Sequence, residues 1–72
     1  MKASSFVIKF EREVDGRWIA EIPAFPGTLA YGRSKKEAEQ RVSALALRVI
    51  ADQVEHGEYP LSGLAAYGLA SR

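Results

Sequence analysis

Two short segments of alternating apolar and polar residues, joined by a turn, constrain this chain more than any other feature. Residues 5–13 and residues 17–22 both alternate with a period of two, which is typical of strands with one buried face. Between them, Asp15-Gly16 is a turn signal, so the pattern predicts an antiparallel hairpin. The apolar side chains that share its inner face are Phe6, Ile8, Phe10, Trp18, Ala20 and Ile22.

The length of the turn sets the register of this hairpin. A two-residue loop at Asp15-Gly16 would place Phe10 opposite Glu21 and mix charged with apolar side chains on both faces. A three-residue loop over residues 14–16 instead places Phe10 opposite Ala20 and keeps apolar side chains together. Because a slip of one residue turns every side chain to the other face, we predict the three-residue loop, with its glycine in the left-handed conformation.

A proline-rich loop follows the hairpin. Pro23 ends the second strand, since a proline has no N–H to donate to a ladder. Pro26 and Gly27 then predict a tight loop, and residues 28–31 a short third strand. Phe25, between the two prolines, either closes one end of the core or offers a contact to a partner.

A long helix is predicted after this strand. Ser34 and Glu37 form a capping box, in which the Ser34 hydroxyl accepts from the Glu37 amide and the Glu37 carboxylate accepts from the Ser34 amide. The helix extends over roughly residues 35–56, and Gly57 ends it as a left-handed residue. The predicted core stripe of the helix consists of Ala38, Val42, Leu45, Ala46 and Val49.

The same helix has a second apolar edge, formed by Leu47, Ile50 and Val54. About 22 helical residues at 1.5 Å each span ~33 Å, whereas strands of about eight residues span ~26 Å. The last turns should therefore extend past the sheet, and their extra apolar residues favour a surface for a partner. In the alternative, the C-terminal tail folds back and covers this edge.

Two further parts of the chain leave alternatives open. Trp18 either packs across the strands beside Arg12 or anchors an interface. Residues 58–72 have no clean period, and they form either a short fourth strand near residues 64–70 or a tail that docks loosely or on a partner. The predicted order is β-β-β-α with a possible final strand, a single α+β domain over residues 1–72.

Composition limits the function classes. The chain of 72 residues has no Cys and one His, which excludes disulfides and leaves no Cys- or His-based metal site within one chain. A net charge of +1 lacks the excess of a nucleic-acid-binding domain. No segment approaches the ~20 apolar residues of a membrane span and the N-terminus is not a signal peptide, so we expect a cytoplasmic protein. Because so small a core needs support, we also expect a homo-oligomer or a partner protein.

Charged residues give little support to an enzyme. His56, in the last helical turn, is explained by the helix dipole. The acidic residues of the hairpin would have to converge to bind Mg²⁺ as in a nuclease, and a solvated face explains them better: Glu11, Glu13, Asp15 and Glu21. A basic cluster at the helix start could bind phosphate, but is more simply a solvated helix face: Arg33, Lys35, Lys36 and Arg41. We expect no catalytic residue, metal or cofactor.

One ordered string of residues is more specific than any of these patterns. It runs Asp15-Gly16-x-Trp18-x-Ala20-Glu21-Ile22-Pro23-x-x-Pro26-Gly27, and is followed by Gly32 and a helix start at Ser34 to Ala38. Over Phe6 to about Gly57, the chain resembles the HicB-like antitoxin domain. The resemblance implies a partial RNase H-like fold without nuclease activity.

The resemblance also implies a partner. HicB-like antitoxins bind and neutralise a small HicA-type toxin, an mRNA-cleaving protein, and many of them oligomerise and carry a C-terminal DNA-binding module. The tail after Gly57 has no basic helix-turn-helix pattern, so we expect no direct DNA binding. Two other hypotheses stay open: a stand-alone dimer or tetramer that self-associates through Leu47, Ile50, Val54 and the tail, and a vestigial nuclease.

Overall fold

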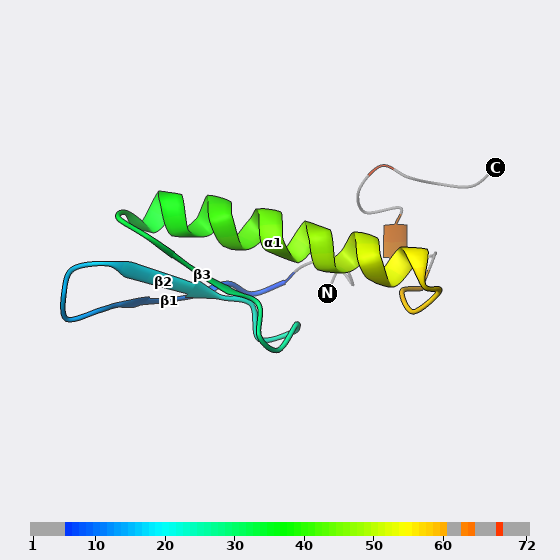
Figure 1. Ribbon diagram of the computed structural model, residues 1–72, viewed down its shortest axis with the longest axis horizontal. Coiled ribbons are helices and arrows are strands. Elements are labelled where there is room, and N and C mark those ends of the chain that lie inside the picture. The colour runs from blue at the N-terminus through cyan, green and yellow to red at the C-terminus, as the bar shows by residue number, and fades with distance from the viewer. Residues whose placement is uncertain (1–5, 61–62, 65–67, 69–72) are drawn as a thin grey trace.

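The protein folds into one antiparallel sheet with a long helix across one face (Figure 1). The computed structural model describes residues 6–60, 63–64 and 68. Strands β1 (Lys9–Arg12), β2 (Trp18–Glu21) and β3 (Leu29–Gly32) lie in the order β1-β2-β3, and helix α1 (Lys35–Glu55) follows. The predicted α+β meander with one helix is confirmed. Most of the possible fourth strand at residues 64–70 lies outside the described residues, as does most of the tail.

The hairpin has the predicted register. Phe10 faces Ala20 and Lys9 faces Glu21 across β1 and β2. The Glu13 amide donates to the Arg17 carbonyl at 2.7 Å, which closes the three-residue loop. Gly16 has a φ of 92°, the left-handed conformation that this loop requires. The three-residue loop is therefore confirmed.

The first strand is shorter than predicted. The expected strand over residues 5–13 is wrong at its start, because Phe6–Ile8 lie outside β1. Pro23 explains the difference, since it offers no N–H where β1 would need a partner on β2. The chain turns away there, and the Ile22 amide donates to the Thr28 carbonyl at 3.1 Å.

The core lies between α1 and the inner face of the sheet. Its fully enclosed residues are mostly small, which lets the helix lie close to the strands: Ala20, Ile22, Ala38, Val42 and Ala46. The predicted stripe is confirmed at its Ala and Val42 positions, whereas Leu45 and Val49 are only half-buried. Ile50, predicted on the second apolar edge, is buried instead, with 5% of its surface exposed. The reason is spacing, because residues 38, 42, 46 and 50 are four apart and follow one face of the helix.

Ser34 caps the start of α1, and Gly57 follows its end. The Ser34 hydroxyl accepts from the Glu37 amide at 3.1 Å, as predicted. The second half of the predicted capping box is wrong, because the Glu37 carboxylate accepts from the Arg33 amide at 2.7 Å and not from that of Ser34. The extended backbone of Ser34 brings the preceding amide to the carboxylate. At the other end Gly57 has a φ of 71° and ends the helix as predicted.

Helix α1 extends past the sheet, as its length predicts. Figure 1 shows its last turns beyond the ends of the strands. Among the described residues, no helix is both long enough and apolar enough to cross a membrane.

The contacts of Glu37 make stability depend on pH. The hydrogen bond from the Arg33 amide, helped by the charges of Arg41 and Arg33, holds the pKa of Glu37 below its ordinary value of 4.5. The stabilisation is therefore full above pH 4.5 and is lost as the pH falls through the lower pKa of the folded state. We expect Glu37→Gln to lower the melting temperature at neutral pH and to change it little at a pH where Glu37 is protonated. Thermal melts at both pH values check this, and an equal difference at both would contradict it.

Candidate functional site

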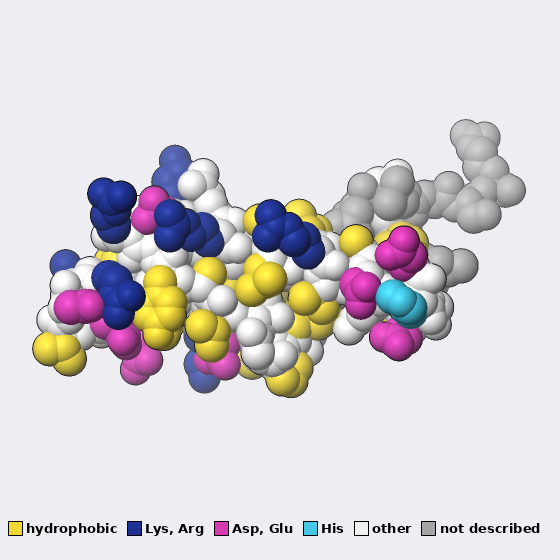
Figure 2. Space-filling model, viewed as in Figure 1, with side chains coloured by type: hydrophobic (Ala, Val, Ile, Leu, Met, Phe, Trp, Pro, Cys, Tyr) yellow, Lys and Arg dark blue, Asp and Glu magenta, His cyan; other side chains and the backbone are white. Residues whose placement is uncertain are grey.

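An apolar hollow opens between the second half of α1 and the segment that precedes β1. Its volume is about 270 Å³. Figure 2 shows hydrophobic side chains gathered along the line between the helix and the sheet. The residues that line this helix–strand hollow are Phe6, Ile8, Ile22, Ser43, Ala46, Leu47 and Ile50.

Local sequence patterns explain why these residues meet. Positions 43, 46, 47 and 50 are spaced by three and four, so they share one side of α1. Phe6, Ile8 and Ile22 alternate along the hairpin and share its inner face. Because β1 is the last strand on this side of the described sheet, no further strand there closes the hollow.

The three helix residues proposed for an interface differ in how far they are buried. Leu47 is exposed over 54% of its surface at the rim of the hollow, whereas Ile50 is buried within it. Val54 is half-buried one turn farther along and does not line the hollow. Leu47 is therefore the accessible contact of this edge, and Ile50 supports the fold.

The two aromatic candidates both pack against the core and stay half-exposed. The Phe25 and Phe6 ring centroids lie 5.0 Å apart at a tilt of 55°, so Phe25 closes the end of the core beside the hollow. Trp18 packs on the core from β2, and the Arg12 guanidinium lies 5.6 Å from the Trp18 ring centroid. Cross-strand packing thus accounts for Trp18 without a partner.

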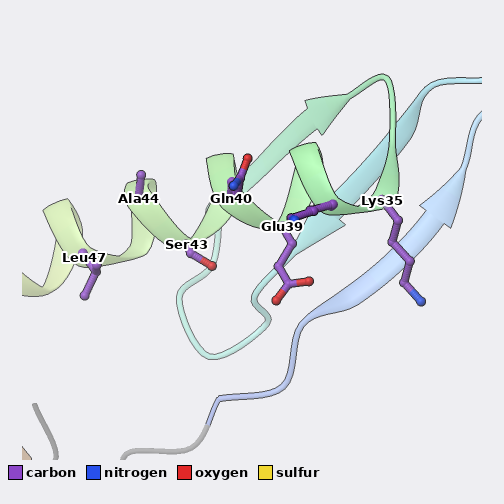
Figure 3. Close-up of a pocket in the computed structure, with 7 residues that line it drawn as sticks. Lys35, Glu39, Gln40, Ser43, Ala44 and Leu47 are labelled. Atoms are coloured by element: carbon purple, nitrogen blue, oxygen red, sulfur yellow. The ribbon is translucent and has the colours of Figure 1, made fainter.

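A shallow depression on α1 continues the hollow toward the helix start (Figure 3). It shares Ser43 and Leu47 with the hollow. Its other lining residues are Lys35, Lys36, Glu39, Gln40 and Ala44. Lys35 reaches across to the sheet, where its Nζ lies 4.8 Å from the Phe10 ring centroid. The apolar surface around Leu47 is therefore bordered by charges at one end.

The predicted basic cluster is tied into the fold. Arg41 donates to the Tyr31 carbonyl at 3.1 Å and lies 3.5 Å from the Glu37 carboxylate. Figure 2 shows Lys and Arg side chains gathered over the first half of α1 and acidic side chains gathered at its other end. Arg41 is thus held by the fold, and all four basic residues of the cluster are exposed to solvent.

The acidic residues of the hairpin do not converge. Glu11 and Glu21 are exposed on the sheet, and Asp15 is paired with Arg17 at 2.8 Å within the turn. His56 donates from Nδ1 to the Asp52 carbonyl at 2.8 Å, a local contact at the helix end. Within residues 6–60, 63–64 and 68, no three His, Asp or Glu are grouped to hold a metal ion. Asp15 and His56 thus make local contacts with neighbouring residues of the chain.

Sequence reasoning missed two features of the surface. The first is the contribution of Phe6, Ile8 and Ile22 to the hollow, although their alternation placed them on the right face. The second is the outer face of the sheet, where Leu29 and Tyr31 are exposed. Alternation along residues 28–31 could have indicated this second feature.

A comparison of the chain with protein-family models, curated proteins and solved structures finds no match. What the site can do therefore follows from its own chemistry. An apolar hollow with an exposed leucine and a charged border suits contact with another protein, whose side chains would fill it.

Proposed function

We propose that this chain is a HicB-like antitoxin, which binds a HicA-like mRNA-cleaving toxin and neutralises it by protein–protein contact. The ordered string from Asp15 to Gly27 supports this proposal. Two glycines of this string, Gly16 and Gly27, have φ values of 92° and 87°, a backbone conformation that glycine adopts without steric cost. The antitoxin would act by covering the toxin, so it needs a surface and no catalytic group.

The helix–strand hollow is the surface we assign to the toxin. The observation that carries this is the contiguous apolar lining of the hollow with Leu47 exposed at its rim, since an exposed apolar patch marks a surface for contact with another protein. An apolar side chain of the toxin would fill the hollow and bury Leu47. Phe25 extends the same surface at the end of the core.

Leu47→Glu should abolish neutralisation while it leaves the fold intact. A buried charge at the centre of an interface costs about 2 kcal/mol or more, which weakens binding roughly thirtyfold. Each variant is co-expressed with a HicA-like toxin from the same genome. Growth rescue and co-purification of the complex are the measurements.

Val14→Glu is the matched control, because Val14 is fully exposed in the hairpin turn and does not line the hollow. It should rescue growth as the wild type does. If the wild-type chain neither binds nor rescues, the toxin proposal is wrong. Equal rescue by both variants would show that the toxin uses another surface.

A stand-alone homo-oligomer, a dimer or tetramer without a toxin, is the second candidate. The observation that favours it is the exposed outer edge of β1, at which the described sheet ends. Mass measurement in solution separates the candidates in part, since a toxin-dependent module needs no self-association and a stand-alone oligomer requires it.

A further inference from the structure

A row of side chains runs along α1 from its start to the helix–strand hollow. Lys36, Gln40, Ser43 and Leu47 are spaced by four, three and four residues, and all of them line the depression beside the hollow. At 3.6 residues per turn, this spacing keeps the four side chains within about 60° of one another around the helix. Figure 3 shows Gln40, Ser43 and Leu47 following one another along α1. The row therefore continues the surface around Leu47 toward the helix start.

The shape of this row fits a second helix. The row covers about eleven residues, which is about 16 Å or three turns at a rise of 1.5 Å per residue. Alternating steps of three and four residues are the spacing at which two helices pack along each other's length. The short side chains of Ser43 and Ala44 in the middle of the row let the axis of a second helix approach closely. The backbone of α1 is hydrogen-bonded within the helix, so an incoming strand finds no ladder to extend here.

The two ends of the row differ in chemistry. At the hollow, the lining is apolar apart from Ser43. At the helix start, the lining of the depression has Lys35 and Lys36 against one acidic residue, Glu39. Neither lysine forms an ion pair with any residue that the structure describes. A segment that lies along the row is therefore complementary to it when it carries an apolar side chain at one end and a carboxylate at the other.

We infer that the toxin binds this surface with one amphipathic, acidic helix, which lies along α1. An apolar side chain of that helix enters the hollow beside Leu47, and a carboxylate about three turns away pairs with Lys36. The hollow has a volume of about 270 Å³, below the usual size of a small-molecule site, which suits a single side chain of a protein. The inference rests on the toxin proposal and names the part of the toxin that fills the surface.

Lys36→Glu tests the charge complementarity. Lys36 is exposed in the first turn of α1, where the helix dipole favours a carboxylate, so the variant should fold. We expect its Kd for a HicA-like toxin from the same genome to be about tenfold higher than that of the wild type at low salt. The difference should shrink as the salt concentration rises, because salt screens exposed charges. Isothermal titration calorimetry at low and high salt measures both effects.

Lys9→Glu is the matched control, because it makes the same charge change at an exposed residue of β1 that lines neither the hollow nor the depression. It should bind the toxin as the wild type does. A complex that Leu47→Glu abolishes and Lys36→Glu leaves unchanged would overturn the acidic helix and keep the toxin proposal, whereas a wild-type chain that does not bind the toxin overturns both. Equal losses in Lys36→Glu and Lys9→Glu would mean that net charge is responsible, and would also overturn the inference.

A second set of variants identifies the residue of the toxin that pairs with Lys36. Each acidic residue on the helices of the toxin is changed to lysine in turn. One of these changes should weaken binding to the wild type and restore binding to Lys36→Glu, because exchanging both charges forms the pair again. That residue should lie about eleven positions from an apolar residue on the same face of its helix. If no lysine variant on a toxin helix restores binding, the inference is wrong.

Discussion

Gly32→Ala should destabilise the fold by about 3 kcal/mol, the largest effect we expect from a single methyl group in this chain. A Cβ at Gly32 would lie 2.9 Å from the carbonyl carbon of Glu37 and closer still to the amide nitrogen of Ala38. Both contacts are with the backbone of α1, so no side chain can move aside. The end of β3 and the first turn of the helix would have to separate, and a domain this small has ~3–5 kcal/mol in total.

Urea unfolding followed by circular dichroism measures the effect. Gly16→Ala is the control, because an added Cβ there meets nothing within 4 Å and only the φ of 92° is unfavourable. The control should cost about 1–2 kcal/mol from that conformation. If Gly32→Ala is as stable as Gly16→Ala, the helix start is not held against β3 as described.

The sequence predicted those parts of the fold that local patterns determine. The hairpin register followed from charges and apolar residues within one hairpin, and Gly57 marked the end of α1 because helices commonly end on a left-handed residue, which is usually glycine. The sequence marked Gly32 only as part of a motif and gave no reason for it, since its real constraint is the approach of a helix that begins later in the chain. The partner of Glu37 was missed for a similar reason, because the path of the chain into α1 decides which amide meets the carboxylate.

The candidate site was predictable in part. The exposure of Leu47 follows from its place on the second edge of the helix. The burial of Ile50 does not, because it depends on where α1 lies relative to Phe6 and Ile22, a matter of tertiary packing. The hollow is lined by residues of α1, of the segment before β1 and of the segment after β2. The periodicity of apolar residues within one segment therefore does not predict it.

Val42→Ala should lower the free energy of unfolding by about 2 kcal/mol. Among the residues that the structure describes, Val42 is the largest side chain that is fully buried, and it lies in the middle of the stripe that α1 turns to the sheet. Loss of two methyl groups removes their burial and leaves a cavity, which the better helix propensity of alanine offsets by about half a kcal/mol.

Leu47→Ala removes a larger piece of side chain and should cost less, within about 0.5 kcal/mol, because Leu47 is 54% exposed. Urea midpoints at unchanged slope measure both variants. The order of the two effects is the informative result, since it reports which side of α1 faces the core. A greater loss for Leu47→Ala would mean that the helix is rotated about its axis, and it would remove the surface we assign to the toxin.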